Sequence, residues 1–236
     1  MSYITALAVL SMIILVHESG HFMAARACGI KIRIFSVGFG PALAKKHIRG
    51  TEFRISLFPI GGYVLPDIRD EKEFFAISPL RRIVFSIGGP AGNIAAAIAI
   101  LSAADMIAHG FTPGGTVLGP IQAALSFFSH YLSAIPGMFS NPEKLSGIVG
   151  IVSQGGGFIG GDFMKTLAFA AMMNMNLALF NLLPFPVLDG GKILLYLLEK
   201  ASPRTVKLHL PISLASWGII VLLTVYVTVM DIVRLA

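Results

Sequence analysis

Charged residues and cysteines are both scarce in this sequence. Asp, Glu, Lys and Arg make up only 13% of its 236 residues, which is about half the share typical of a soluble domain. Its one cysteine, Cys28, excludes an intramolecular disulfide, and we interpret it as a plain small residue rather than a ligand. With 55% hydrophobic residues and a mean hydropathy of +0.80, the chain is predicted to form one compact membrane domain.

Four apolar runs are long enough to cross a bilayer as helices, which takes about 20 residues each. We therefore predict an all-α polytopic membrane protein with about four transmembrane helices. The predicted spans are residues 3–25, 83–107, 166–187 and 212–230. No Lys or Arg occurs in residues 1–10. The first run therefore lacks the basic start of a cleaved secretory signal, and we expect it to remain as a span.

Positive charge lies mainly in two of the links between these runs. The formal charge is +6, and eleven of the eighteen Lys and Arg residues fall between Arg26 and Arg82. Four more lie between the third and fourth runs. Clustering by link is typical of the positive-inside rule rather than of a nucleic-acid patch. We therefore expect no nucleic-acid partner, both of these links in the cytosol and both termini outside.

The cytosolic link, residues 26–82, contains a β pattern. The stretch EFRISLFPIGGYVLPD, Glu52–Asp67, has two short apolar runs around a Pro-Ile-Gly-Gly turn, which predicts a small β-hairpin. Two alternatives remain open for it. One is a hairpin that lies against the membrane domain, and the other is an ordinary surface hairpin.

The outer link, residues 109–165, has few charges and two distinct parts. Apolar residues recur at helical spacing in Gly119–Phe139, which predicts an amphipathic helix on the membrane surface. Residues 146–161 are rich in glycine. No Gly-Lys-Ser/Thr follows them, so they indicate a flexible or re-entrant connector rather than a phosphate loop. Both parts together form either a gate for substrates or a tether between the second and third spans.

An ionisable cluster, His17, Glu18 and His21, lies inside the first span. Such groups cost about 2.5–3.5 kcal/mol each on insertion scales, so they usually mark function. In a helix His17 and His21 share one face, about 6 Å apart along the axis. This H-E-x-x-H pattern is typical of zinc hydrolases, in which the histidines bind metal and the glutamate is the general base. The alternative, histidines at a helix end, fits poorly because Phe22–Ala25 continues the apolar run.

Two histidines leave a catalytic zinc ion one protein ligand short. We predict that Asp189 supplies it, because Pro184 and Pro186 break the third span just before it. Broken backbone at membrane depth is tolerated only inside protein or beside a wet cavity. Taken alone, Asp189 also fits a helix N-cap. The remaining histidines lie in the links without a supporting motif: His47, His109, His130 and His209.

Together these residues resemble the site-2 protease family of intramembrane zinc metalloproteases. His17–His21, HESGH, resembles the family's zinc motif, and NLLPFPVLDG, Asn181–Gly190, fits its N-x-x-P-x-P-x-L-D-G pattern. Four more stretches resemble the RseP-like bacterial branch. They are SVGFG at 36–40, GGYV at 61–64, GGPAGN at 88–93 and LSGIVGIV at 145–152.

The resemblance implies a set of roles and partners. One Zn²⁺ per chain would be bound by His17, His21 and Asp189, with Glu18 as general base. The implied substrates are single-pass membrane proteins, such as anti-sigma factors or signal-peptide remnants. They would be cut within the bilayer of the bacterial cytoplasmic membrane, near its cytosolic side. The hairpin would hold the unwound substrate as an added strand. The implied substrate-binding residues are Asn176, Asn181, Gly61, Gly62 and Tyr63.

Two features keep other interpretations open. Relatives in the RseP-like branch carry PDZ domains between spans two and three, but the outer link has about 55 residues. That is too short for a domain of about 80–100 residues beside the amphipathic helix. A metal transporter or sensor would have more intramembrane ligands, often in inverted repeats, whereas one three-ligand site and no repeat are found. A catalytically inactive scaffold would not need Glu18.

Overall fold

The computed structural model describes residues 1–140 and 146–235. The chain forms two compact units, which are described separately. The first unit comprises Met1–Val9, Ile94–Asn176 and Ala215–Ala236. The second unit comprises Leu10–Asn93 and Leu177–Leu214.

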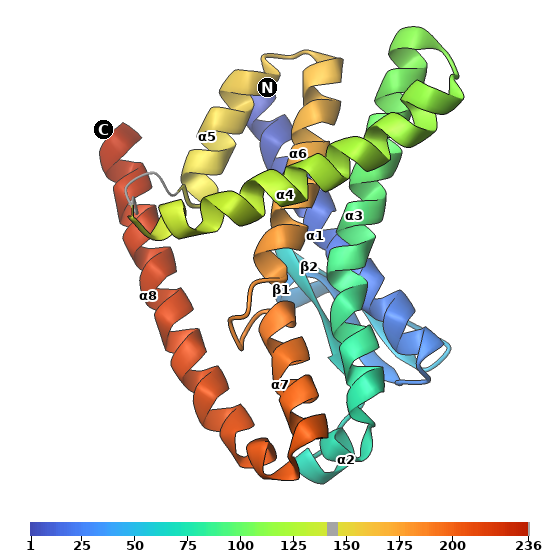
Figure 1. Ribbon diagram of the computed structural model, residues 1–236, viewed down its shortest axis with the longest axis vertical. Helices are drawn as coiled ribbons and strands as arrows, with labels where there is room; N and C mark the ends of the chain where they lie inside the picture. Colours follow the sequence, from blue (N-terminus) through green and yellow to red (C-terminus); the bar gives the residue numbers. More distant parts are fainter. Residues whose placement is uncertain (141–145, 236) are drawn as a thin grey trace. The chain divides into compact units, whose positions relative to one another are not determined.

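Among the described residues, four helices are long and apolar enough to span a membrane (Figure 1), which confirms the predicted fold class. Many of their apolar side chains are exposed, as expected for helices that face lipid. On α8 (His209–Leu235), Trp217 is 61% exposed and Leu222 is 72% exposed. The four helices are α1 (Ser2–Ala27), α3 (Pro79–His109), α6 (Phe163–Asn181) and α8 (His209–Leu235).

The third span is shorter than the sequence predicted. We expected it to reach Val187, but α6 ends at Asn181. The amide of Leu182 still bonds back to the Ala178 carbonyl at 3.1 Å. Beyond it the chain turns, because Pro184 and Pro186 lack an N–H donor and disfavour helical backbone in the residue before each.

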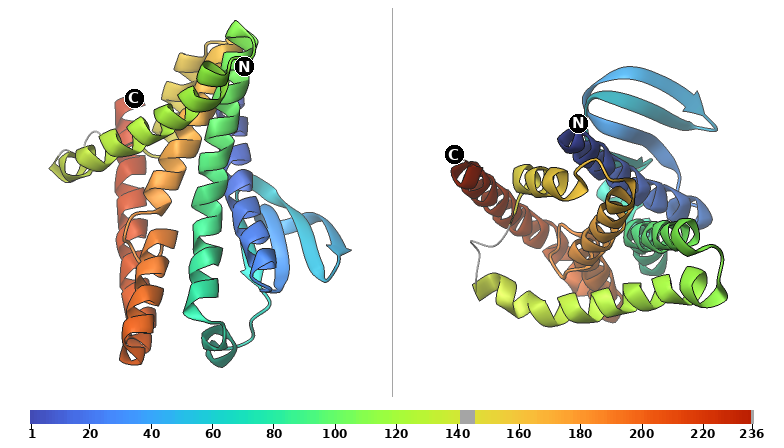
Figure 2. Two further views of the ribbon diagram at one scale, coloured as in Figure 1. Left: turned by 45° about the vertical axis from the view of Figure 1, so that its right-hand side comes forward. Right: turned by 90° about the horizontal axis from the view of Figure 1, so that it is seen from above.

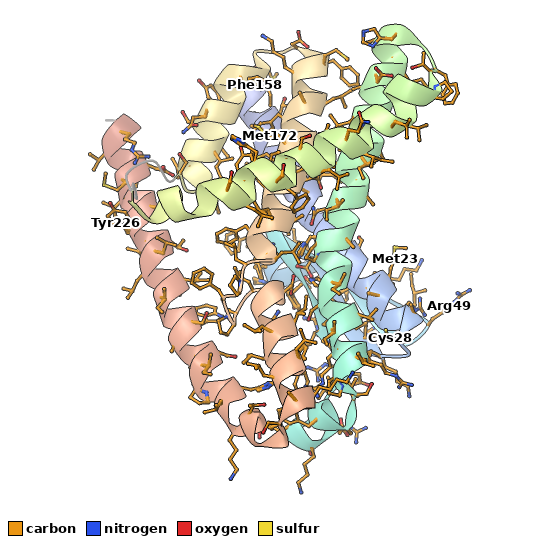
Figure 3. The ribbon with its side chains drawn as sticks, in the orientation of Figure 1. Met23, Cys28, Arg49, Phe158, Met172 and Tyr226 are labelled. Carbon is orange, nitrogen blue, oxygen red and sulfur yellow. The ribbon has the colours of Figure 1, made fainter. Side chains whose placement is uncertain are left out.

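A small sheet in the second unit is confirmed, although its pairing differs from the prediction. Strand β1 covers Ile32–Ile48 and β2 covers Thr51–Pro66, and they pair antiparallel across a turn at Arg49 and Gly50. The sheet extends to one side of α1 (Figure 2). The turn at Arg49 lies back near the end of α1, where Arg49 and Arg26 line one pocket (Figure 3). We expected residues 52–67 to pair with themselves, but both halves of β2 pair with β1.

The register of this sheet shows which run forms an edge. Ser36 pairs with Tyr63 on one side and with Arg54 on the other. Residues Gly62–Pro66 pair with β1 on one side. Among the described residues no strand pairs with their other side, so this run forms an edge of the sheet. Gly38 and Gly40, with φ of 87° and 88°, let β1 bend, and residues 42–48 after the bend pair with the first half of β2.

An apolar cluster joins the end of α1 to the start of β1. Its buried members are Ala25, Ile30 and Ile32, and Cys28 packs against them just past the end of α1 (Figure 3). Cys28 therefore packs as the small apolar residue that the sequence predicted.

One buried ion pair connects α3 with α7 (Asp189–Ala201) in the second unit. Arg82 is only 2% exposed, and its guanidinium donates to both carboxylate oxygens of Glu199. The rings of Phe74, on α2 (Glu71–Ala76), and of Tyr196 lie within 4.8 Å of the Arg82 charge. Burial raises the pKa of the Tyr196 hydroxyl to about 12, so it stays neutral beside this pair.

The sequence predicted an amphipathic helix in the outer link, and the structure has a helix there, in the first unit. After η1 (Pro113–Leu118), helix α4 covers Gly119–Ser140. Ala124 and Phe128 on α4 pack with Ala97 of α3, whereas Leu125 is 66% exposed. α4 therefore has one packed face and one exposed apolar face. Its predicted place on the membrane surface stays a prediction.

Residues 146–161 were predicted to form a flexible or re-entrant connector, and the flexible form is wrong, whereas the re-entrant form stays a prediction. They contain α5, Ile148–Ile159. The Asp231 carboxylate of α8 bonds to the start of this helix. Asp231 Oδ2 accepts hydrogen bonds at 2.8 Å from the amides of both Gly147 and Gly150. A carboxylate at a helix start satisfies donors that the helix cannot bond itself.

Glycines in α5 provide close packing rather than flexibility. A Cβ at Gly155 would lie 2.5 Å from the Phe169 ring, and one at Gly156 would lie 2.2 Å from the Tyr3 ring. Ile159, which is 1% exposed, packs with Ala6 and Phe169. The described part of the outer link is thus mainly helical.

Candidate metal centre

The two histidines of α1 converge as their spacing predicts. Nε2 of His17 lies 3.1 Å from Nε2 of His21. Both side chains are buried, with 7% of each residue exposed. Two ring nitrogens that face each other with lone pairs at this separation repel. A proton or a cation between them removes that repulsion.

Asp189 joins these histidines from the first turn of α7. Its Oδ2 atom lies 3.2 Å from His17 Nε2 and 3.1 Å from His21 Nε2, and the residue is 4% exposed. The side chain of Asp189 is thus not a surface N-cap, the alternative that the sequence left open. Among the described residues, these three form the one group of three or more His, Cys, Asp or Glu side chains placed to hold a metal ion.

Two glycines after Asp189 bring the broken end of α6 against α7. A Cβ at Gly190 would lie 2.1 Å from the Leu182 carbonyl oxygen, and a Cβ at Gly191 would lie 2.1 Å from the Phe185 carbonyl carbon. No side chain fits at either position without moving the backbone. The Asp-Gly-Gly sequence therefore fixes where the Asp189 carboxylate lies.

The glycines of α3 allow that helix to touch α1. A Cβ at Gly20 would lie 2.1 Å from the Gly88 carbonyl oxygen, so the two backbones are in contact. A Cβ at Gly89 would lie 2.4 Å from His21 Nε2 and 2.6 Å from His17 Nε2. Gly89 thus leaves the space that the two imidazoles occupy.

The outward nitrogens of both imidazoles are bonded to α3. His17 Nδ1 lies 2.7 Å from Asn93 Oδ1, and His21 Nδ1 lies 2.8 Å from the Phe85 carbonyl oxygen. Both acceptors require a proton on Nδ1, which leaves each Nε2 lone pair directed at Asp189. Two such nitrogens and one carboxylate oxygen match the kind of donor set that three-ligand catalytic zinc sites use.

Glu18 lies next to the edge of the sheet. It is half-buried, and a Cβ at Gly62 would lie 3.2 Å from Glu18 Cγ and 2.8 Å from the Ser36 carbonyl oxygen. Tyr63, beside it on the edge, stacks on Phe39 with 6.1 Å between ring centroids. The absence of a side chain at Gly62 therefore leaves room between the edge and Glu18.

Gly61 also needs its small size. Its φ is +108°, and a Cβ there would lie 2.2 Å from the Phe39 ring. Asn181, the last residue of α6, donates to its own helix at the Leu177 carbonyl, 3.0 Å away. Asn176 is half-buried on the same helix. The role of these residues in substrate binding stays a prediction.

The sequence did not identify several neighbours of the metal ligands. Lys192 Nζ donates to Asp189 Oδ1 at 3.2 Å, three residues along α7. Its spacing from Asp189 was the available signal, because residues three apart share a helix face. Asn93 lies in the GGPAGN stretch, to which no role was given. The Phe85 contact uses a main-chain carbonyl and leaves no sequence signal.

The other histidines have partners elsewhere, as expected of residues outside the metal site. His47 Nε2 lies 3.1 Å from Glu52, and His109 Nδ1 lies 3.0 Å from Asp105. His209 packs edge-on against Phe75. His130 packs against the ring of its neighbour, Tyr131.

Comparison with known proteins identifies relatives over most of the chain. The model of Peptidase family M50 matches residues 5–225. A Haemophilus influenzae protein named "Regulator of sigma E protease" is 43% identical over 107 residues, covering 41% of this chain and 24% of that protein. A Campylobacter jejuni protein named "Putative zinc metalloprotease" is 37% identical over 102 residues, covering 39% of this chain and 28% of that protein.

A longer match covers 94% of this chain and 77% of an Arabidopsis thaliana protein, a chloroplastic "Probable membrane metalloprotease", at 26% identity. That alignment extends over 342 positions. Because this chain has 236 residues, the Arabidopsis protein contains residues there that have no counterpart here. The matches to the Campylobacter jejuni protein and to the "Putative zinc metalloprotease" proteins of Chlamydia pneumoniae and Chlamydia trachomatis cover 28%, 19% and 18% of their lengths. The chain thus spans less than a third of each.

Proposed function

The chain belongs to peptidase family M50, and from that premise we propose that it is a zinc-dependent intramembrane endopeptidase. The observation that carries the proposal is the convergence of His17, His21 and Asp189 beside Glu18. Both histidines and the glutamate lie on α1, a helix able to cross a membrane. Metal ligands and a general base inside a span are costly unless they serve function.

Zinc would be held by Nε2 of His17, Nε2 of His21 and Oδ2 of Asp189. When bound, the ion supplies a Lewis acid that polarises a peptide carbonyl and acidifies water. Glu18 is not needed as a ligand, so its carboxylate is available to take a proton from the attacking water. Glu18 then passes that proton to the leaving amide nitrogen. Lys192 donates to Oδ1 of Asp189 and keeps Oδ2 directed at the histidines.

The edge of the sheet gives a place for the substrate backbone. A peptide bond inside a helix is hidden from water, so the substrate must unwind before it is cut. The run Gly62–Pro66 pairs on one side only in the recorded register, and an extended segment can add to such an edge by main-chain hydrogen bonds. Gly62 adjoins Glu18. We infer that this edge presents the scissile bond to Glu18.

Membrane topology follows from the distribution of basic residues. The link containing residues 26–82 carries most of them, which supports a cytosolic location by the positive-inside rule. Both termini would then face outward. The metal centre would lie about 10 Å inside the cytosolic boundary, at about 1.5 Å per residue back from Arg26. We place the protein in the bacterial cytoplasmic membrane.

Single-pass membrane proteins are the substrate class that this site suits. The catalytic groups lie within a span, so a transmembrane segment reaches them from the bilayer. The name of one relative, "Regulator of sigma E protease", supports anti-sigma-factor-like substrates. Signal-peptide remnants are a second candidate class, because each of them is also a single membrane-spanning segment. A transporter or sensor needs further intramembrane ligands, and the described residues hold only this one ligand group.

Co-expression with a panel of tagged single-pass membrane proteins tests this function. The wild-type chain should shorten at least one tagged protein, and Glu18→Gln should leave it intact. Glu71→Gln is the matched control, because Glu71 is exposed on α2. Equal cleavage by wild type and Glu18→Gln would contradict the proposal.

A further inference from the structure

The buried side chain of Asn93 contacts His17 at Nδ1, the ring nitrogen that faces away from Asp189. Asn93 of α3 has no exposed surface, and its Oδ1 lies 2.7 Å from His17 Nδ1. Its Nδ2 donates to the Ile13 carbonyl of α1 at 3.1 Å. A carbonyl can only accept, so this second bond assigns the nitrogen end of the amide to Ile13. The oxygen end of the Asn93 amide therefore faces His17.

An amide oxygen accepts but cannot donate, so His17 Nδ1 must carry the proton. In a neutral imidazole the lone pair then lies on Nε2, the atom 3.2 Å from Asp189 Oδ2. We propose that Asn93 is a positioning residue that fixes the tautomer and the ring orientation of His17 for metal binding. This inference rests on the proposed zinc-dependent function.

The choice of an amide suits the charges around it. Glu18 and Asp189 already bring two carboxylates to this region, and Lys192 offsets one of them. A third carboxylate without its own partner would add buried negative charge, which is costly in an apolar surrounding. Asparagine accepts the Nδ1 proton without adding charge. Its amide nitrogen is used as well, because Ile13 accepts from it.

The spacing on α3 explains how Asn93 reaches the ring. Gly89 and Asn93 are four residues apart, so they share one face of the helix. Gly89 leaves space for the imidazoles, since a Cβ there would lie 2.6 Å from His17 Nε2. Asn93, one turn later, reaches Nδ1 of the same ring. α3 thus leaves room for the metal-facing side of His17 and bonds its other side.

Zinc affinity, measured by competition with a chelator on the purified full chain in detergent, tests the inference. Asn93→Leu removes the acceptor and should weaken zinc binding by about 10–100-fold. Asn93→Asp keeps an acceptor for Nδ1, so its zinc affinity should stay within a few-fold of wild type, while its buried negative charge should lower the thermal stability of the protein. Asn174→Leu is the matched control, because Asn174 is also buried but bonds the Ala170 carbonyl of its own helix. This control should bind zinc like wild type.

Cobalt substitution adds a readout of ligand geometry. The visible absorption of the Co²⁺-loaded protein should change in Asn93→Leu and not in Asn174→Leu. Wild-type zinc affinity and wild-type cobalt absorption in Asn93→Leu would overturn the inference.

Two further outcomes are decisive if that variant does not fold. In the metal-free wild-type protein, ¹⁵N NMR of the histidine rings should show a proton on His17 Nδ1, and an Nδ1 without a proton would overturn the inference. This measurement needs no zinc. Failure of the wild-type chain to bind zinc would instead contradict the proposed function, so the two failures are distinguishable.

Discussion

His21 Nε2 lies 3.1 Å from Asp189 Oδ2, although the two residues are 168 positions apart in the chain. One belongs to a long apolar helix and the other to the first turn of a short helix that follows a proline-broken span. This contact adds Asp189 as a third candidate ligand to the two histidines of the motif. The proposed chemistry depends on this contact and on Glu18 beside it.

Replacing Gly62 tests the sheet edge. Gly62→Val places carbon between Glu18 and the Ser36 carbonyl oxygen, where a Cβ alone would lie 3.2 Å and 2.8 Å from them. Cleavage should fall on the order of 10²-fold, because small displacements near the chemistry are costly. Zinc content should stay unchanged. Gly157→Ala is the control, since a Cβ there meets nothing within 4 Å. Full activity in Gly62→Val would remove the edge from the mechanism.

Proline at the same edge gives a second test of substrate pairing. Tyr63→Pro removes one main-chain donor from the run that we propose to pair with substrate. Cleavage should fall while zinc binding holds. Arg54→Pro and Ser56→Pro lie in the inner run of β2 and should disturb the sheet itself. An active, folded Tyr63→Pro protein would argue against strand addition.

The buried ion pair predicts a large effect on stability. Glu199→Gln leaves the Arg82 charge uncompensated, and Arg82 is only 2% exposed. The expected loss is about 3–5 kcal/mol, or roughly 6–20 °C in melting temperature for a chain of this size. Thermal unfolding in detergent measures it. Glu71→Gln should melt like wild type, and an equally small shift in Glu199→Gln would contradict the assignment.

Topology is tested by cysteine labelling from either side of the membrane. In a Cys28→Ala background, Lys45→Cys should react with an impermeant reagent only after the membrane is opened. Lys165→Cys, in the outer link, should react in intact cells. Both positions are exposed, so reactivity reports the side of the membrane. Labelling of position 45 from outside would reverse the orientation.

The outer link predicts a limit on substrate size if it acts as a gate. Leu132 is 57% exposed on α4. Leu132→Glu should therefore disturb contacts made by the exposed apolar face of α4 and leave its packed face unchanged. Substrates with bulky outer domains should then be cut, while short substrates are cut as before. Ser129→Glu is the control, because Ser129 is an exposed polar residue of the same helix. An unchanged size limit would favour the tether.

Much of the metal centre could be predicted because its signals are local or chemical. Residues four apart must meet on a helix, so His17 and His21 converge wherever α1 lies. Asp189 was found from a missing ligand and two prolines. Asn93 could not be found in this way, because its contact depends on how closely α1 and α3 cross. That crossing depends on Gly20 and Gly88, whose backbones touch.

The errors in the fold have the same origin in long-range contacts. The glycine-rich segment was expected to be a flexible or re-entrant connector, but it contains helix α5, which is capped by Asp231, 84 residues after Gly147. The β prediction located its residues but not their partners. Residues 34–37 of β1 lie between the two halves of β2, so both halves pair with β1 rather than with each other.

The most direct test is to measure zinc content and cleavage together in Glu18→Gln. Purified wild-type protein and the variant should each hold about one zinc per chain, because Glu18 is not among the proposed ligands, His17, His21 and Asp189. Cleavage of a single-pass substrate should fall by about 10²–10⁴-fold in the variant, the usual contribution of a general base. A Glu18→Gln protein that keeps its zinc and still cuts at the wild-type rate would contradict the account.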